Sequence, residues 1–133
     1  LVVTTPQQAA AEVAERAGTM ASMVDQKVVG VIENMAYLES TCPHCDQTHR
    51  VDLFGTGGGA RVSEALTLRL GYDVPLLAEV PLDPAMSASG DAGVPLVQTH
   101  ADNPAAAALT GLAERLASRK RGLAGRKLNL VVN

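Results

Sequence analysis

The 133-residue sequence has few aromatic side chains, and this shortage limits what the protein can bind. Aromatic residues make up 2% of the chain and tryptophan is absent, so a stacking platform for single-stranded nucleic acid is not expected. The formal net charge is -3, which gives no general attraction to polyanions. No apolar run approaches the roughly 20 residues that a membrane-spanning helix needs. We therefore expect neither a nucleic-acid partner nor a membrane partner.

Cysteine is also scarce, because the chain contains two. A secreted scaffold held by several disulfides is not expected, and the first residues lack the basic start and apolar run of a signal peptide. These features favour a reducing, cytoplasmic location. The chain also lacks an initial methionine and opens in an apolar, strand-like run, so we expect it to be a fragment of a longer protein.

Hydrophobic residues make up 47% of the chain, which is enough for one core. Apolar runs over 1–4, 27–33 and 74–80 predict three buried strands. A helix between the first two strands, opened by a capping box over Thr5–Gln8, predicts a parallel βαβ unit. The predicted buried face of that helix consists of Ala10, Val13, Ala14, Ala17, Met20, Ala21 and Val24. The fold class is therefore α/β, with a mostly parallel sheet flanked by helices.

The remaining segments are less regular. Residues 37–50 are expected to form a polar loop, and residues 95–97 an extended stretch or short edge strand. Further helices are expected after a glycine run, at 85–89, and from Pro104 onward. We expect residues 1–118 to fold and residues 119–133 to form a basic, flexible tail.

The two cysteines stand in the sequence Cys42-Pro43-His44-Cys45, whose spacing lets both sulfurs reach one metal centre or pair with each other. Two thiolates supply half of a tetrahedral site, and four interpretations are open. Thioredoxin-type redox chemistry needs Cys42 at a helix N-terminus, and the residues after Cys45 are a poor helix. A zinc knuckle would need His44 or His49. The pair could also be inert. A cluster shared between two subunits explains the half-site directly and is favoured.

Polar residues also follow the predicted strands, where the carboxyl ends of parallel strands meet and ligands usually bind. Asn34 follows the second strand and is either a turn residue or an amide that recognises a nucleotide base. The glycine run 55–59 formally matches G-x-G-x-x-A, but the match stands alone. We therefore interpret the run as a turn whose glycines allow a close backbone approach before a helix.

Several short motifs, taken in order, carry a family resemblance. They are Val2-Val3-Thr4-Thr5-Pro6-Gln7, Gly30-Val31-Ile32-Glu33-Asn34-Met35, Cys42-Pro43-His44-Cys45, Phe54-Gly55-Thr56-Gly57-Gly58-Gly59 and Pro81-Leu82-Asp83-Pro84. The series resembles the Mrp/ApbC family of P-loop ATPases that carry iron–sulfur clusters, which are relatives of MinD and the nitrogenase iron protein. The resemblance extends from Leu1 to about Leu116.

This resemblance implies a fold, a function and roles for five residues. The fold is the C-terminal part of a mostly parallel P-loop NTPase sheet. The function is that of a homodimeric carrier whose paired cysteines, here Cys42 and Cys45, hold a [4Fe–4S] cluster for delivery to apo iron–sulfur proteins. Asn34 matches the position whose amide contacts adenine, and the segment containing Pro81 and Asp83 matches the loop that lines the base pocket.

The chain also departs from the family pattern. The Walker A lysines, the phosphate loop and the magnesium-binding aspartates of the family precede the segment at which this chain begins. ATP and Mg²⁺ are therefore expected in the full-length protein, and hydrolysis by this segment alone is not expected. Two rivals stay open, which are a non-enzymatic zinc-binding or interaction module and a MinD-type partitioning ATPase without a cluster.

Overall fold

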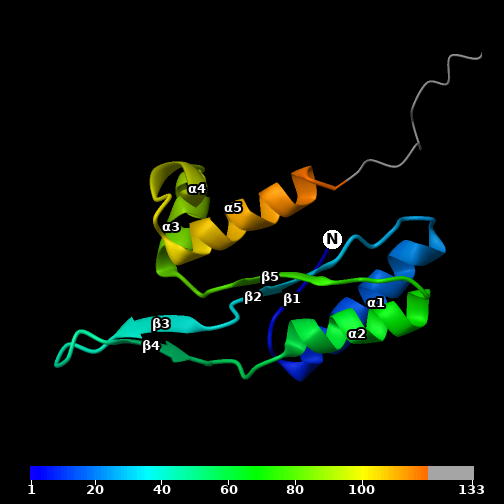
Figure 1. The fold of residues 1–133 in the computed structure, drawn as a ribbon, viewed down its shortest axis with the longest axis horizontal. Helices are drawn as coiled ribbons and strands as arrows, with labels where there is room; N and C mark the ends of the chain where they lie inside the picture. The colour runs from blue at the N-terminus through cyan, green and yellow to red at the C-terminus, as the bar shows by residue number, and fades with distance from the viewer. Residues whose placement is uncertain (120–133) are drawn as a thin grey trace, which may run out of the picture.

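A three-stranded parallel sheet forms the centre of the computed structural model, which describes residues 1–119 (Figure 1). The strands are β1 (Val2–Thr4), β2 (Val31–Asn34) and β5 (Leu76–Val80), in the order β1-β2-β5. Val3 pairs with Ile32, and Asn34 pairs with Val80. All three predicted strands are confirmed, although each is shorter than the apolar run that predicted it.

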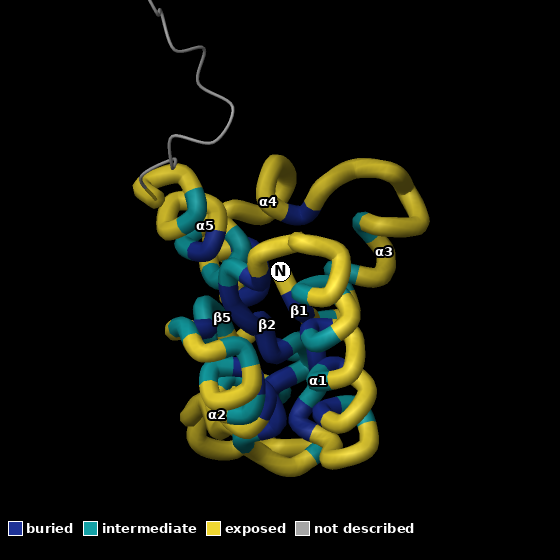
Figure 2. The backbone as a smooth tube through the Cα atoms, turned by 90° about the vertical axis from the view of Figure 1, so that its right-hand side faces the viewer, coloured by how far each residue is buried: buried dark blue, intermediate teal, exposed yellow. Residues whose placement is uncertain are grey.

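Helices cover both faces of this sheet (Figure 1). Helices α1 (Gln8–Met23) and α2 (Gly58–Leu70) lie on one face, and α5 (Pro104–Ala117) lies on the other. Adjacent residues of β2 point to opposite faces, because Val31 packs with Val62 and Leu66 of α2 whereas Ile32 packs with the α5 side. Figure 2 shows the buried residues running along the strands between these helical layers. The predicted α/β class is confirmed.

A β-hairpin extends from the sheet where β2 ends (Figure 1). It consists of β3 (Leu38–Thr41) and β4 (Thr48–Val51), which pair antiparallel with Leu38 opposite Val51 and Thr41 opposite Thr48. The prediction of a polar loop over 37–50 is therefore wrong. From Glu39 to Val51 every residue except Cys42 is exposed, so neither face of the hairpin has the hydrophobic alternation that identifies a half-buried strand.

Two short helices connect β5 to α5. Helix α3 (Pro84–Ala92) begins at Asp83, whose carboxylate accepts a hydrogen bond from the Ala85 N–H at 2.7 Å. Helix α4 (Leu96–Thr99) replaces the extended stretch predicted at 95–97, and that prediction is wrong. The buried Leu96 packs on the α5 side of the sheet, and the His100 N–H closes a helical turn on the Leu96 carbonyl.

The start and the buried face of α1 differ from the sequence prediction. The helix begins at Gln8, Gln7 is the N-cap without a side-chain cap, and the Thr5 hydroxyl hydrogen-bonds the Gln7 side chain, so the capping box is absent. Of the predicted face only Ala14 is fully buried; the helix buries Ala11, Ala14 and Gly18 instead. Gly18 lets α2 approach closely, since a Cβ there would lie 2.7 Å from the Leu66 methyl carbons.

The other side of α1 and the free edge of β1 carry exposed apolar side chains. Val3 is 57% exposed, Val13 63% and Met20 67%. Val3 and Val13 border an open hollow of about 380 Å³ between the strand and the helix. Within the described residues, no helix has both the length and the apolar character needed to cross a membrane. The predicted tail falls outside the described residues except for Arg119, whose guanidinium donates to the Val29 carbonyl at 2.7 Å.

Candidate functional site

The two cysteines lie in the turn at the tip of the hairpin. The Cys42 N–H donates to the Gln47 carbonyl and the Asp46 N–H donates to the Cys42 carbonyl, both at 2.9 Å. Asp46 adopts a left-handed conformation with a φ of 53°, which lets the chain reverse into β4. Both thiols are free, with Cys42 half-buried and Cys45 exposed. The turn therefore presents two sulfur atoms together at the end of an extended arm.

The turn also favours the ionised form of one of these thiols. The pKa of Cys42 is lowered mainly because the backbone N–H of His44 donates to its sulfur, with further donation from the Cys45 side chain and backbone N–H. Burial acts in the opposite direction and is the smallest influence. Thiolate is the form that binds metals and acts as a nucleophile, so the geometry suits Cys42 to metal ligation.

The hairpin does not complete a metal site by itself. Among residues 1–119, no group of three or more His, Cys, Asp or Glu side chains is placed to hold a metal ion. His44 and His49 therefore do not join the cysteines, and His49 lies on β4 opposite Ser40. A single-chain zinc knuckle built with these histidines has no support in this arrangement. What the hairpin offers is a two-thiolate half-site.

The thioredoxin-type interpretation also lacks its structural requirement. Cys42 directly follows β3 and precedes a turn, so it is not at the N-terminus of a helix. The lowered pKa of its thiol comes from hydrogen bonds within the turn, and no helix dipole contributes.

The three residues predicted to bind nucleotide line one pocket. Asn34, Pro81 and Asp83 border an open cavity of about 300 Å³ at the carboxyl ends of β2 and β5, together with Met35, Leu82, Met86 and Ser87. The Asn34 Oδ1 accepts from the Met35 N–H at 2.9 Å. The Asp83 carboxylate is occupied, because Oδ1 caps α3 and Oδ2 accepts from the Asn103 amide at 2.6 Å. Asp83 therefore shapes the pocket by joining α3 to the start of α5.

The glycine run leads from the hairpin back into the sheet layer. Gly57 is the left-handed N-cap of α2, with a φ of 75°. A Cβ on Gly58 would collide with the carbonyl groups of Thr5 and Pro6, and one on Gly59 would lie 2.8 Å from the Glu33 Cβ. The buried Glu33 carboxylate accepts a hydrogen bond from the Gly59 N–H at the start of α2. The predicted close backbone approach is confirmed.

Sequence reasoning missed a group of side chains at the base of the hairpin. The Arg50 guanidinium lies over the Tyr37 ring, 4.0 Å from its centroid, and its Nε donates to the Asp52 carboxylate at 3.0 Å. The hydrogen bond from Arg50 to Asp52 raises the pKa of Arg50, so the guanidinium stays protonated. Arg50 is the single Lys or Arg between 38 and 51, and this isolation in a polar segment was the available signal.

Solved structures with a similar fold are ATPases of the MinD type. MinD of Pyrococcus horikoshii complexed with Mg-ADP matches with a TM-score of 0.62 and 21% identity, over 96% of this chain and 44% of that chain. MinD of Aquifex aeolicus matches with a TM-score of 0.59 and 16% identity, over 90% of this chain and 44% of that chain. At these identities the similarity concerns the fold alone. The structure thus matches part of the MinD fold, here with a protruding cysteine hairpin.

Sequence comparison gives the family. The family model described as a NUBPL iron-transfer P-loop NTPase matches residues 1–117. The iron–sulfur cluster carrier protein of Mycobacterium leprae is 50% identical over 130 residues, and that of Pyrococcus furiosus is 37% identical over 125 residues. These matches cover 98% and 94% of this chain but 33% and 39% of the relatives, so the chain spans about a third of their length. The chain belongs to the NUBPL-type iron-transfer P-loop NTPase family, and the resemblance seen in its motifs is confirmed.

Proposed function

We propose that the chain is the C-terminal part of a homodimeric iron–sulfur cluster carrier that holds a [4Fe–4S] cluster between two copies and delivers it to apo iron–sulfur proteins. Its cluster ligands are Cys42 and Cys45 of each copy. The observation that carries the proposal is the two-thiol tip of the hairpin, which the described chain does not complete with a third ligand. Below, the full-length protein means the carrier to which, under this proposal, the chain belongs.

The geometry of the hairpin supports sharing of the cluster between copies. A [4Fe–4S] cluster takes four thiolate ligands, and one hairpin offers two. The tip lies away from the sheet and both flanking strands are exposed, so a second hairpin can approach it without displacing the core (Figure 1). The lowered pKa of Cys42 favours the thiolate that cluster binding requires.

The pocket at the end of the sheet supports a nucleotide site in the full-length protein. Asn34 offers the donor and acceptor of an amide, and Pro81 and Asp83 also line the pocket. The predicted ligands are ATP and Mg²⁺, with the phosphate-binding groups supplied by the preceding part of the full-length protein. Binding of nucleotide is expected to alter the dimer and its hold on the cluster.

Anaerobic reconstitution of the full-length protein with ferrous iron and sulfide tests this function. We expect about four irons and four sulfides per two copies, with the visible absorbance of thiolate-to-iron charge transfer. Cys42→Ala should lose the cluster, and His44→Ala, a substitution in the same turn, should keep it. Binding of one zinc per copy without sulfide, lost in both variants, would instead support the zinc-binding module.

A further inference from the structure

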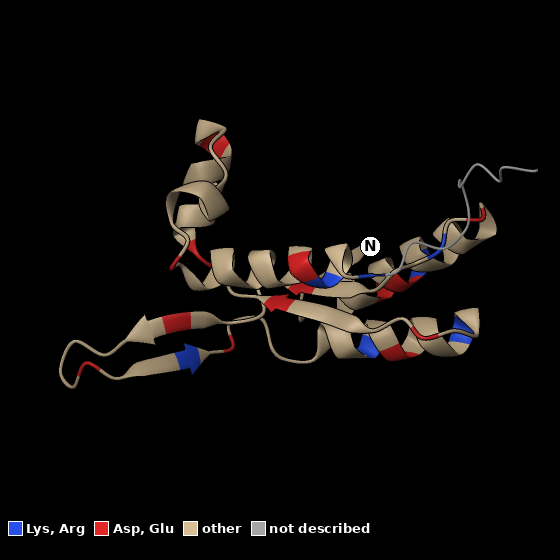
Figure 3. Ribbon diagram, turned by 45° about the horizontal axis from the view of Figure 1, so that its top comes forward, with Lys and Arg blue, Asp and Glu red and all other residues tan. Residues whose placement is uncertain are grey.

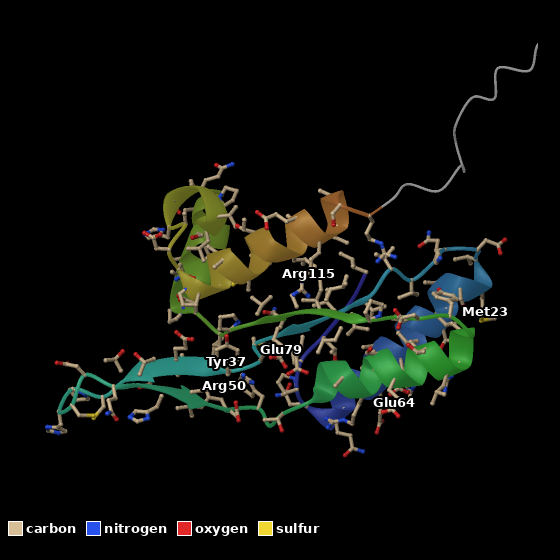
Figure 4. All side chains as sticks on the ribbon, in the orientation of Figure 1. Met23, Tyr37, Arg50, Glu64, Glu79 and Arg115 are labelled. Carbon is tan, nitrogen blue, oxygen red and sulfur yellow. The ribbon has the colours of Figure 1, made fainter. Side chains whose placement is uncertain are left out.

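At the base of the hairpin, the side chain of Arg50 contacts Tyr37 and lies near Glu79, two residues outside β4. Arg50 lies on β4, opposite Glu39 of β3. Its guanidinium covers the Tyr37 ring at 4.0 Å, and its Nη1 lies 3.9 Å from the Glu79 carboxylate on β5. Figure 4 shows Tyr37, Arg50 and Glu79 gathered where the hairpin leaves the sheet. One side chain of the cysteine arm therefore lies against both the connection that follows β2 and the end of β5.

The same strand ends form the nucleotide pocket. The Tyr37 carbonyl accepts from the Leu82 N–H at 2.7 Å, and Leu82 stands between Pro81 and Asp83 in the pocket wall. The Ala36 N–H donates to the Val80 carbonyl at 3.0 Å, which continues the pairing of β2 and β5 past Asn34. Tyr37 thus touches the pocket loop through its backbone and the cysteine arm through its ring.

Arginine is suited to this position for a geometric reason. A guanidinium is flat, so its face can stack on Tyr37 while its N–H groups point in its own plane toward Asp52 and Glu79. Figure 3 shows acidic and basic segments side by side on the two strands of the hairpin. A lysine keeps the charge but cannot stack and bridge two carboxylates together. The Arg50 side chain therefore links the β2–β3 connection at Tyr37 and Glu79 of β5 to the base of the cysteine arm.

We propose that Arg50 is a positioning residue that couples the nucleotide pocket to the cysteine hairpin, so that nucleotide binding changes the hold on the cluster through the Tyr37–Arg50–Glu79 contact. This inference rests on the proposed function, because it assigns the residues through which the two sites of that function communicate. Arg50 touches neither the cluster ligands nor the pocket residues, so it acts through Tyr37 and Glu79.

The test compares two arginine-to-glutamine variants of the full-length protein. Arg50→Gln removes the charge and the stacking, and Arg69→Gln removes an exposed arginine at the far end of α2. After anaerobic loading, the rate at which bathophenanthroline captures iron is measured with and without ATP. The unaltered protein should show a change of at least about fivefold on adding ATP. Arg50→Gln should load a normal amount of cluster and show a ratio of about one, whereas Arg69→Gln should behave like the unaltered protein.

Two further variants separate coupling from general structure. Tyr37→Phe keeps the ring under the guanidinium and should preserve the ATP response, whereas Tyr37→Leu should lose it. Arg50→Lys should restore part of the response. If Arg50→Gln loads cluster and keeps the full ATP response, the inference is overturned and the proposed function stands. The inference also falls if the unaltered protein carries a cluster but neither its release rate nor its hairpin responds to ATP.

Hydrogen exchange on the protein without cluster decides the case in which loading fails. We expect ATP to slow exchange of backbone amides over 38–51 in the unaltered protein and in Arg69→Gln, but not in Arg50→Gln. An equal ATP effect in all three proteins would overturn the coupling role. Failure of the unaltered protein to load a cluster would overturn the proposed function instead, and the exchange result would still decide for or against the coupling.

Discussion

The parallel sheet and the cysteine hairpin are stabilised by different interactions. The sheet is sealed by fully buried side chains, including Val31, Val62 and Leu66 on one face and Ala105 and Ala106 on the other. The hairpin has no core, and its strands are held by backbone pairing, by the Thr41 and Thr48 hydroxyls at 3.3 Å, and by Arg50 at its base. The two cysteines thus lie on the part of the chain that is most exposed and has no packed core.

This difference has a physical reason. Under the proposed function, a cluster that is passed between proteins must be reached from outside, so its ligands would not lie in a packed core. An exposed two-stranded arm is marginal by itself and needs a fixed attachment. Here the attachment includes the Arg50 contact, the backbone hydrogen bonds of Ala36 and Tyr37 to the end of β5 and the segment that follows it, and the buried hydrogen bond from Gly59 to Glu33 on the returning chain. The exposed tip is thereby combined with a base that contacts the sheet.

The largest expected effect is a loss of solubility and cooperative folding when the 133-residue chain is produced without the rest of the full-length protein. Val3, Val13 and Met20 expose apolar surface along β1 and α1, and β1 has an open edge. We expect the isolated chain to be poorly soluble or partly molten, with strong binding of a hydrophobic dye and no cooperative unfolding. A sharp thermal transition in a monomeric sample would count against this expectation.

Replacing a buried leucine should lower the free energy of unfolding much more than replacing an exposed leucine of the same helix. Leu66 is fully buried between α1 and the sheet, and Leu68 on the same helix is 78% exposed. Leu66→Ala should destabilise the full-length protein by about 2–5 kcal/mol through lost burial and a cavity. Leu68→Ala should change stability by less than about 0.5 kcal/mol. Urea unfolding measures both, and similar costs would mean that Leu66 is not a core residue.

At the hairpin, a substitution is expected to leave the stability nearly unchanged but to abolish cluster binding. Cys42→Ala should change the unfolding free energy of the cluster-free protein by less than about 0.5 kcal/mol, because the residue lies in a turn without a core around it. The same variant should retain no cluster after reconstitution. Urea unfolding and iron analysis of one preparation make the comparison. A loss of several kcal/mol would show that the turn contributes to folding.

The smallest effect concerns the ionisation of Cys42. Its pKa is lowered by N–H donation to the sulfur, so the reactive thiolate should appear at lower pH than in an ordinary thiol. In Cys45→Ser, which keeps a hydroxyl donor, alkylation by iodoacetamide should therefore rise with a midpoint below the usual value of about 8.5. Full-length protein unfolded in urea is the control and should show the ordinary midpoint. Equal midpoints for the folded and the unfolded protein would show that the hydrogen bond from the His44 N–H does not lower the pKa of Cys42.

The sequence predicted the sheet better than the arm because burial leaves a periodic pattern and exposure does not. Apolar runs predict the strands around Val31 and Val80, whereas the polar sequences of β3 and β4 predict a loop. The buried face of α1 was misassigned because the helix has two apolar strips, and the contact of Gly18 with Leu66 decides between them.

The residues of the candidate site were likewise predictable only in part. The spacing of Cys42 and Cys45 indicates the two thiols, a strand end indicates Asn34, and the family resemblance indicates Pro81 and Asp83. The last three residues line one pocket. The contacts of Arg50 could not be predicted, because Tyr37 and Glu79 are distant in sequence and meet it only in the folded chain. The hydrogen bonds that occupy the Asp83 carboxylate are likewise a tertiary feature.

Native mass spectrometry of the reconstituted full-length protein tests the central claim most directly, because it counts chains and cluster atoms in one particle. The account predicts a species of two chains and one [4Fe–4S] cluster, absent from Cys42→Ala and retained in His44→Ala. A single chain that carries a complete cluster or one zinc ion would contradict the claim that two half-sites are joined.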